Sequence, residues 1–324
     1  MSRIAIIGAG VAGSTAAQVL SRKGHTVTVF DKSRGTGGRI ACRQTEFGAV
    51  DHGTPYFEVT RPEIELFCQG ALSEGVLQKW QPRFVRIMPD GERVPEQKNC
   101  LVGVPTMSRL TRFLLQSSEL ITGTRIVEAL HKAEGWTLKD EKGLSYSGFE
   151  QLIITTPPLQ AMPLLTAAPS LQEQVCRPVM ECCWVAILES GECCQAPYDI
   201  AVFEQGALRR IVSHHAKPGR PERTVWQIQA SPAWSAEHQD LPKEQVAALL
   251  AEVFIGASGI TPPRQYKVWA HRWLYGFTAQ PLQRPCLYDA VLSLGVCGDW
   301  MLGRTVEDAA MSALQLVTVM SKPG

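Results

Sequence analysis

The segment RIAIIGAGVAGSTAAQVLSRKGHTVTVFD, residues 3–31, decides the fold. Residues 3–8 form a short apolar run that predicts a β-strand, and residues 14–24 carry the pattern of a helix. A second strand is expected over residues 25–30, and it leads directly to Asp31. A strand, a glycine turn, a helix, a strand and then an acid is the order of a dinucleotide-binding βαβ unit.

Gly8, Gly10 and Gly13 give the turn the spacing GxGxxG. The first permits the tight turn, the second lets a pyrophosphate approach the backbone, and the third lets the helix pack closely on the strand. Asp31 is expected to accept hydrogen bonds from adenosine ribose hydroxyls, and it would repel the 2′-phosphate of NADP. The cofactor residues expected from this segment are Gly8, Gly10, Val11, Ala12, Gly13 and Asp31. The alternative is a glycine turn with nothing bound.

A basic, glycine-rich loop, VFDKSRGTGGRIACR at residues 29–43, follows the second strand. A nicotinamide dehydrogenase needs no such loop, whereas FAD is longer and needs further cover for its pyrophosphate and ribityl chain. Arginines neutralise phosphate charge, and glycines allow backbone contact with a flavin. The loop therefore favours non-covalent FAD over NAD, with contacts expected from Lys32, Arg34, Gly38 and Arg39. The alternative is a solvated basic turn.

Five stretches carry a family resemblance. They are DKSRGTGGRIACR with GAVDHGTPYF, LVGVPTMSRLTRFL (101–114), VWAHRWLYG (268–276) and GVCGDWMLGRTVEDAAMSAL (295–314). Together they resemble the flavin amine-oxidase superfamily and, more closely, the bacterial renalases. The resemblance spans nearly the whole chain in the expected order.

The resemblance implies further cofactor contacts. Val127 would lie against the adenine, and residues 155–157 would re-enter the cofactor domain, with Thr156 as a cofactor contact. Near the C-terminus, Gly298-Asp299 ends a strand, and the acid would bind a ribityl hydroxyl. A helix then begins near Val306 and Glu307, and its positive end would face the flavin N1–C2 region. The alternative is a plain core helix.

Two positions depart from the family pattern. Asp308 replaces a usual glycine, and its carboxylate is expected either to pair with Arg304 or to point elsewhere. Thr54-Pro55 stands where the family usually has Ala-Gln. Both departures affect the expected substrate and activity.

The strand around residues 268–275 is rich in aromatic side chains. With period 2, Trp269, His271, Trp273 and Tyr275 share one face, which suits a flat ligand above a flavin or, alternatively, a packed core. By resemblance, His52 and Tyr56 lie near the flavin. The candidates at the substrate are His52, Tyr56, Trp269, His271 and Trp273. Lys267 is a weaker candidate to hold a water at the flavin, and His214-His215 is expected to be exposed.

The resemblance implies an FAD-dependent oxidase of mis-reduced dihydronicotinamide dinucleotides, the 1,2- or 1,6-isomers of NAD(P)H. Hydride would pass to flavin N5, and oxygen would reoxidise the flavin and yield hydrogen peroxide. Such a reaction needs stacking and a short transfer distance but no general base. Two alternatives stay open: an amine oxidase or desaturase in the same fold, and an FAD-binding protein without oxidase turnover.

The 324 residues favour two domains. We expect an α/β fold: a Rossmann-like FAD-binding domain of the GR2 type and a second, discontinuous α+β substrate domain with an antiparallel sheet. The first would comprise residues 1–60, 119–160 and 286–324, and the second residues 61–118 and 161–285.

Bulk composition narrows the function classes. A net charge of +1 gives no global attraction to nucleic acid, and no stretch is apolar enough to span a membrane. The expected partners are a small-molecule substrate and oxygen, and the expected location is the cytoplasm. The ten cysteines include no CxxC, so no metal site is expected. The oligomeric state stays open.

Overall fold

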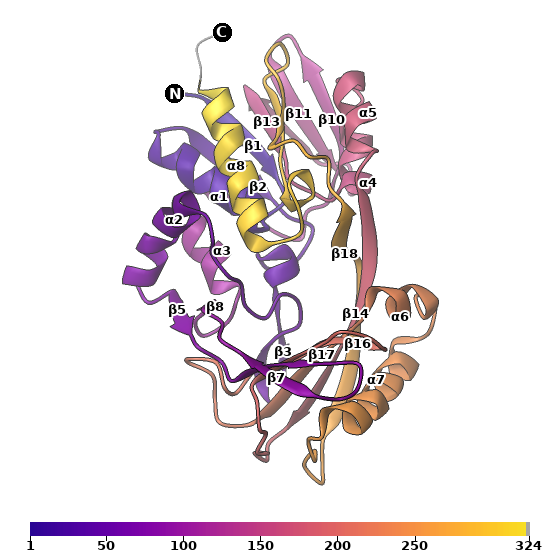
Figure 1. The fold of residues 1–324 in the computed structure, drawn as a ribbon. Coiled ribbons are helices and arrows are strands. Elements are labelled where there is room, and N and C mark those ends of the chain that lie inside the picture. The colour runs from indigo at the N-terminus through magenta and orange to yellow at the C-terminus, as the bar shows by residue number, and fades with distance from the viewer. Residues whose placement is uncertain (322–324) are drawn as a thin grey trace.

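The computed structural model describes residues 1–321 and divides into an upper and a lower part (Figure 1). The upper part contains a six-stranded sheet in the order β19-β20-β13-β1-β2-β9. All neighbours pair in parallel except β19 with β20. The strands are β1 Arg3–Ile7, β2 Thr26–Phe30, β9 Glu119–Ile121, β13 Gln151–Ile154, β19 Leu287–Asp289 and β20 Leu294–Val296. Apolar runs such as RIAII suit strands that are buried on both faces.

Helices cover one face of this sheet. Alternate residues of β1, Ile4 and Ile6, belong to the same buried cluster as apolar side chains of α1 and α8. The helices near this face are α1 Val11–Arg22, α2 Pro62–Ser73, α3 Arg109–Leu114 and α8 Val306–Met320. The predicted strand, glycine turn, helix and strand of residues 3–31 is confirmed, because α1 begins immediately after Gly10.

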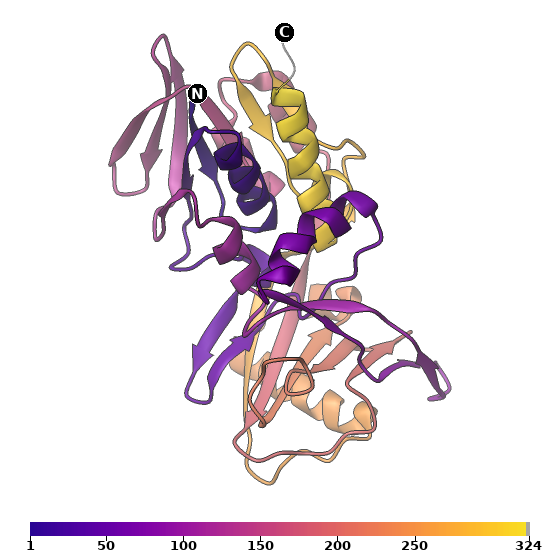
Figure 2. The same cartoon turned by 90° about the vertical axis from the view of Figure 1, so that its left-hand side faces the viewer.

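The opposite face carries a small antiparallel sheet of β10 Ile126–Lys132, β11 Gly135–Asp140 and β12 Ser145–Phe149 (Figure 2). Ala5 and Ile7 of β1 pack there with Trp136, which is fully buried. The Trp136 indole N–H donates to the carbonyl of Leu292 at 2.8 Å. Short helices complete this layer: α4 Pro158–Ala161, η2 Met162–Leu164 and α5 Pro169–Val175.

The lower part is a seven-stranded sheet in the order β18-β14-β17-β16-β15-β6-β7. Only β15 and β6 pair in parallel. The strands are β6 Phe84–Ile87, β7 Arg93–Glu96, β14 Val179–Ser190, β15 Ile200–Phe203, β16 Leu208–Ser213, β17 Thr224–Ala230 and β18 Lys267–Gln280. The long strands β14 and β18 run between the two parts (Figure 1). The expected antiparallel sheet is thus confirmed.

The two faces of this sheet have different neighbours. Helices α6 Pro232–Glu237 and α7 Lys243–Ser258 lie on one face, where Leu250 and Phe254 are fully buried. The other face packs against the hairpin of β3 Cys42–Thr45 and β4 Gly48–Asp51 and continues into the cavity described below. A further pair, β5 Leu77–Trp80 and β8 Cys100–Gly103, joins the core that contains α2 and α3.

The proposed domain boundaries remain a prediction, but the packing informs them. Helices α2 and α3, which fall in the expected substrate segments, share a buried cluster with α1. Residues of α5 likewise pack with the upper sheet through Leu171 and Val175. Chain segments assigned to the substrate part therefore contribute to the core beside the upper sheet.

Candidate functional site

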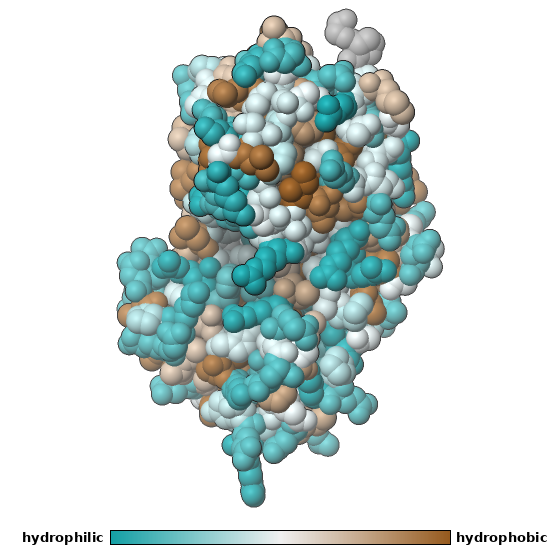
Figure 3. All heavy atoms as spheres, turned by 180° about the vertical axis from the view of Figure 1, so that it is seen from behind, coloured by the Kyte–Doolittle hydropathy of each residue, from teal (hydrophilic) through white to brown (hydrophobic). Residues whose placement is uncertain are grey.

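A cavity of about 1620 Å³ lies where the upper and lower parts meet. Seen from behind, the surface is hollowed between the two parts (Figure 3). Its walls come from the glycine turn, the 31–43 loop, the start of α8, and strands β14, β16, β17 and β18. This volume exceeds the roughly 300–1,000 Å³ of an ordinary ligand pocket. The cavity is thus large enough for a long cofactor together with a second ligand.

The three glycines of the turn differ in what surrounds them. Gly8 has a φ of +112°, which side-chain-bearing residues rarely adopt. A Cβ on Gly13 would lie 1.9 Å from the carbonyl oxygen of Gly8, so the helix approaches the strand as expected. A Cβ on Gly10 would meet no protein atom within 4 Å, and Gly10 lines the cavity. The protein's own packing therefore does not explain the glycine at position 10.

Asp31 and the loop after it lie along the same wall. The Asp31 carboxylate accepts a hydrogen bond from the Ala9 N–H and another from the Ser33 N–H, each at 2.7 Å. These bonds fix its orientation beside the cavity. Lys32 also lines the cavity and donates to the Gln160 side chain at 3.1 Å; burial and the nearby Arg125 lower the Lys32 pKa. Arg34 lines the cavity and is exposed.

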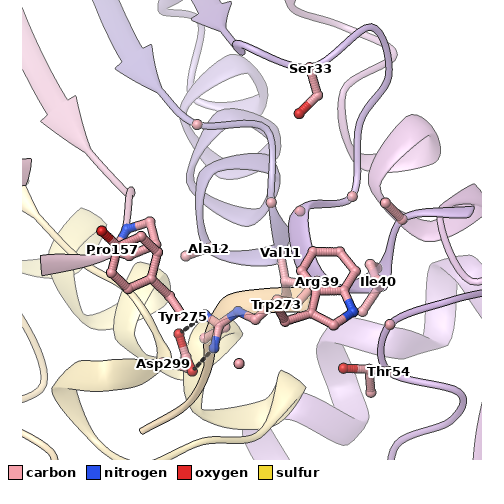
Figure 4. A pocket seen from close by; sticks show the side chains of 18 of the residues that line it. Val11, Ala12, Ser33, Arg39, Ile40, Thr54, Pro157, Trp273, Tyr275 and Asp299 are labelled. Atoms are coloured by element: carbon pink, nitrogen blue, oxygen red, sulfur yellow. Dashed lines mark hydrogen bonds and ion pairs between the residues drawn. The ribbon is translucent and has the colours of Figure 1, made fainter. Parts of the chain in front are cut away.

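Arg39 and Asp299 meet across the cavity, as the dashed lines in Figure 4 show. Arg39 Nη1 donates to Asp299 Oδ2 at 2.8 Å, and Nη2 donates to Oδ1. Thr278 of β18 adds a hydrogen bond to Oδ2 at 3.3 Å. The acid that the resemblance places at a ribityl hydroxyl is therefore paired with an arginine of the N-terminal loop. Gly38 and Gly298 also line the cavity.

The N-terminal end of α8 also faces the cavity, through Val306 and Glu307. Thr305 caps the helix, and its hydroxyl accepts from the Asp308 N–H at 3.0 Å. The Glu307 carboxylate accepts from the backbone N–H groups of Thr60 and Arg61 at 2.8 and 2.7 Å. The Glu307 side chain is thus used to hold residues 60–61, while the helix end supplies partial positive charge to the cavity.

Of the two alternatives for Asp308, an ion pair with Arg304 or a side chain that points elsewhere, the structure shows the second. The Asp308 carboxylate accepts from the Arg304 and Thr305 backbone N–H groups at 3.0 Å, and its ion-pair partner is Arg61 at 2.8 Å. Burial raises the pKa of Asp308, but the hydrogen bonds from Thr305 and Arg61 outweigh this and lower it. Asp308 does not line the cavity; it closes a capping box at the start of α8.

Val127 and Thr156 lie at the cavity wall formed by the upper part. Val127 is 42% exposed, so its apolar surface is open to a ligand. The Thr156 hydroxyl is buried and, among the described residues, has no hydrogen-bond partner. A buried hydroxyl without a partner is costly, and at the cavity wall this one is positioned to hydrogen-bond a ligand atom.

His52, His271 and Trp273 form an aromatic wall. The His52 ring stacks on Trp273 with centroids 5.1 Å apart and meets His271 edge-on at 4.8 Å. The Trp273 indole N–H donates to the His52 carbonyl at 2.9 Å, which fixes the ring's position. Burial lowers the pKa of each histidine to about 4, and Arg43 contributes in both cases. Tyr56 and Tyr275 also line the cavity.

Neither Trp269, a candidate from the sequence, nor Lys267, a weaker one, lines the cavity, although the Trp269 ring centroid lies 6.1 Å from that of His52. Trp269 does not line the cavity: its indole N–H donates to Glu189 at 2.8 Å, and its ring packs in the core beneath the sheet face. The period-2 pattern puts Trp269 on the correct face but too far along the strand. Lys267 is exposed and pairs with Glu46 at 2.5 Å, away from the cavity.

The histidine pair at 214–215 was expected to be exposed, and this is wrong for His214, which is 3% exposed. It lies with a buried ion cluster, in which Lys217 and Arg220 contact the Asp51 carboxylate at 3.1 and 2.7 Å. Burial opposes ionisation, but these cations hold the pKa of Asp51 well below its usual range. Because Asp51 precedes His52, the cluster fixes the backbone that carries the aromatic wall.

The lower wall of the cavity carries a pair of arginines that the sequence alone does not reveal. Arg209 and Arg210 of β16 both line it, together with Cys183 and Gln229 of the neighbouring strands. Consecutive residues on a regular strand point to opposite faces, so two adjacent arginines at one cavity were not expected.

Comparison with known proteins identifies the N-terminal unit. Residues 6–70 match the family model of the NAD(P)-binding Rossmann-like domain. A stretch of 39 residues is 51% identical to the flavin-containing monooxygenase FMO GS-OX-like 6 of Arabidopsis thaliana. That match covers 12% of this chain and 8% of the monooxygenase, so the chain spans only a small part of that relative's length.

Solved structures match over nearly the full length. Cyclohexylamine oxidase from Brevibacterium oxydans IH-35A has a TM-score of 0.75 at 11% identity, over 98% of each chain. An oxidoreductase from Methanosarcina mazei has a TM-score of 0.71 at 12% identity, over 98% of this chain and 100% of that chain. Putrescine oxidase bound to putrescine has a TM-score of 0.69 at 12% identity, over 99% of each chain.

This chain shares its fold with these oxidoreductases. The predicted fold class, a Rossmann-like domain joined to a part with an antiparallel sheet, is confirmed. At this level of identity the likeness concerns the fold alone. Within residues 1–321, no helix has the length and apolar character to cross a membrane. The same residues hold no cluster of three or more His, Cys, Asp or Glu side chains placed to bind a metal.

Proposed function

We propose that this chain is an FAD-dependent oxidoreductase that oxidises dihydronicotinamide dinucleotides, as in the renalase branch that its sequence resembles. When bound, FAD supplies a two-electron acceptor for hydride and passes the electrons on to oxygen. The observation that carries the proposal is a single cavity with a dinucleotide cradle at one end and the wall of His52, His271 and Trp273 at the other.

The residues at the cradle fit FAD in three respects. Gly10 leaves space that no protein atom fills, and the N-terminal ends of α1 and α8 both reach the cavity with partial positive charge. The unpartnered Thr156 hydroxyl offers a hydrogen bond. In this proposal the upper part binds the adenine and pyrophosphate of FAD. The Arg39–Asp299 pair lies between that region and the part of the cavity that binds the substrate.

The aromatic wall suits a flat, neutral ring as substrate. Trp273 and His52 present stacked faces, and their mutual contacts limit side-chain motion. With a pKa of about 4, His52 and His271 are neutral at pH 7, so they pack as aromatic surfaces and carry no charge. Hydride loss from a dihydronicotinamide aromatises the ring, so orientation by this wall is sufficient without a proton acceptor.

The test is anaerobic mixing of the FAD-loaded protein with 1,2-dihydro-NAD or 1,6-dihydro-NAD. Loss of the oxidised flavin absorbance within the mixing time, restored by oxygen with formation of peroxide, is the expected result. Trp273→Leu should slow this reduction while FAD stays bound, and Trp234→Leu, on α6 away from the cavity, is the matched control. Flavin that neither isomer reduces would contradict the proposal.

Amine oxidation is the second candidate, which the shared fold with cyclohexylamine oxidase and putrescine oxidase favours. The same anaerobic experiment with cyclohexylamine and putrescine separates the two. Reduction by an amine but by neither dihydronicotinamide isomer would assign this chain to amine oxidation. Tight FAD that no donor reduces would indicate a binding protein without oxidase turnover.

A further inference from the structure

A register shift in β16 turns two adjacent arginines toward the cavity. Leu208 pairs with Ala230 and Arg210 pairs with Gln229, so Arg209 is an extra residue in the ladder against β17. Leu208 and Ile211 pack in the core on the helix side of the sheet, whereas Arg209 and Arg210 both line the cavity. Such a bulge changes the direction of a side chain, and bulges of this kind are common next to active sites.

Neither guanidinium is neutralised within residues 1–321. No ion pair or side-chain hydrogen bond joins the half-buried Arg209 or Arg210 to another described residue, whereas Lys217, Arg220 and Arg223, in the loop between β16 and β17, all have carboxylate partners. Burial, then Arg210 and the nearby Arg304, lower the pKa of Arg209. Like charges therefore gather at one wall of the cavity, and the Nε atom of Arg210 is buried without a partner.

Aromatic rings hold both arginines in place. The Arg209 guanidinium lies 4.4 Å from the centroid of Phe277, and that of Arg210 lies 5.1 Å from the centroid of Tyr56. Such stacking leaves the edges of a guanidinium free to donate hydrogen bonds. Beside them Gln229, only 6% exposed, has a side-chain oxygen without a partner among the described residues. The wall is thus cationic and incompletely hydrogen-bonded.

We propose that Arg209 and Arg210 bind a phosphate group of the substrate and so make this cavity selective for anionic over cationic substrates. The inference rests on the proposed function and adds to it a basis for substrate specificity. Paired guanidinium groups match phosphate geometry, and a half-buried cation without a carboxylate partner gains from an incoming anion. A protonated amine would instead meet like charge at this wall, which disfavours it.

The phosphates of the cofactor are proposed to bind at a different place from this arginine pair. The glycine turn and the start of α1 belong to the upper sheet, whereas the two arginines belong to β16 of the lower sheet, near Tyr56 and Phe277. Phe277, which stacks on Arg209, lies on β18, the strand that carries His271 and Trp273 of the aromatic wall. We therefore place the anion site beside the wall assigned to the second ligand.

The first experiment measures binding without turnover. FAD-saturated protein is titrated with inorganic pyrophosphate by calorimetry, for the unaltered chain, for R209Q/R210Q, and for R264Q as control. Arg264 is exposed and does not line the cavity. The double variant should raise the Kd by about tenfold or more for each arginine, as expected for charge-assisted hydrogen bonds, while R264Q should leave it unchanged. An equal Kd in all three proteins would overturn the inference.

The second experiment compares substrates. The rate of flavin reduction at limiting concentration is measured for a 1,6-dihydronicotinamide dinucleotide, the mononucleotide and the riboside, which lacks phosphate. The unaltered chain should prefer the phosphate-bearing forms, and R209Q/R210Q should lose that preference. If R209Q/R210Q folds poorly, R209K/R210K keeps the charge and should retain part of the preference. A riboside as effective as the dinucleotide would overturn the inference.

The two experiments separate the inference from the function on which it rests. If the riboside and the dinucleotide reduce the flavin equally well, the oxidase function stands and the arginine site fails. If neither reduces the flavin but pyrophosphate binding falls in R209Q/R210Q, the anion site stands and the dihydronicotinamide function fails.

Discussion

Arg39 and Asp299, 260 positions apart in the chain, meet as a two-bond ion pair inside the cavity. The Arg39 carbonyl accepts from the Thr54 N–H at 2.7 Å, and a Cβ on Gly53 would lie 1.9 Å from that same oxygen. These contacts connect three segments that are distant in the sequence: the loop after β2, the 53–54 turn and the segment after β20 that carries Asp299. Thr54 contributes through its backbone, so this tie does not require the family's usual residue there.

Replacing Asp299 with Asn should weaken FAD binding. Arg39 would lose its charged partner, and a charge-assisted bond of this kind, with the Asp299 side chain 5% exposed, contributes about 1.5–3 kcal/mol. The FAD dissociation constant, followed by flavin fluorescence, should rise by about tenfold or more. Asp199→Asn is the control, because Asp199 pairs with Arg83 outside the cavity. That variant should lose thermal stability and keep its affinity for FAD.

Alanine at Gly10 and at Gly13 should have opposite consequences. Gly13→Ala forces a Cβ against the Gly8 carbonyl and should destabilise the FAD-free protein by about 1–3 kcal/mol. Gly10→Ala meets no protein atom, so the unfolding midpoint without FAD should stay unchanged while FAD affinity falls. Chemical denaturation and FAD titration measure the two effects separately. Unaltered FAD affinity in Gly10→Ala would show that the cofactor does not approach this turn.

Asp308 should matter for stability more than for flavin chemistry. Asp308→Ala removes the capping box of α8 and the contact with Arg61, and it should cost about 0.5–2 kcal/mol. Asp308→Asn keeps an acceptor for the Thr305 N–H and should cost less. Because the pKa of Asp308 is lowered in the folded state, its contribution is present at neutral pH and is lost as the pH falls through that value. A shifted flavin spectrum in Asp308→Asn would contradict this separation.

His52 and His271 should make the free energy of unfolding decrease at acidic pH. Their folded-state pKa is about 4 against an ordinary 6.5, so the unfolded chain binds more protons between these values. Stability should therefore fall as the pH drops from about 6.5 to 4, and His271→Asn should reduce this dependence. The rate of flavin reduction should stay flat from pH 6 to pH 8 in stopped-flow measurements. A rate that titrates near pH 6.5 would mean that a histidine changes charge during the reaction.

Local sequence signals were sufficient for the first strand, glycine turn, helix and second strand, residues 3–31. Gly8 and Gly13 are required by backbone conformation and close packing, and these demands leave a fixed spacing in the chain. The alternating pattern of β18 likewise identified the face that carries Trp273 and His271. It did not show where along the strand the cavity ends, because Trp269 and Trp273 have the same local pattern.

Features that depend on distant partners were not predictable in this way. The sequence leaves open whether Asp308 pairs with Arg304 or points elsewhere, because its actual partner, Arg61, comes from another segment. His214 precedes a proline- and glycine-containing turn, but the ion cluster at Asp51 buries it. The arginine pair of β16 depends on a bulge against β17, and a bulge leaves no reliable mark in a single sequence.

Titration of the FAD-free protein with FAD tests the central claim most directly. The glycine turn, the 31–43 loop and the start of α8 are proposed to enclose one cofactor along its length. We predict saturation at one FAD per chain, with quenched flavin fluorescence and a higher unfolding temperature. A protein that stays colourless after incubation with FAD, with an unchanged unfolding temperature, would contradict the account.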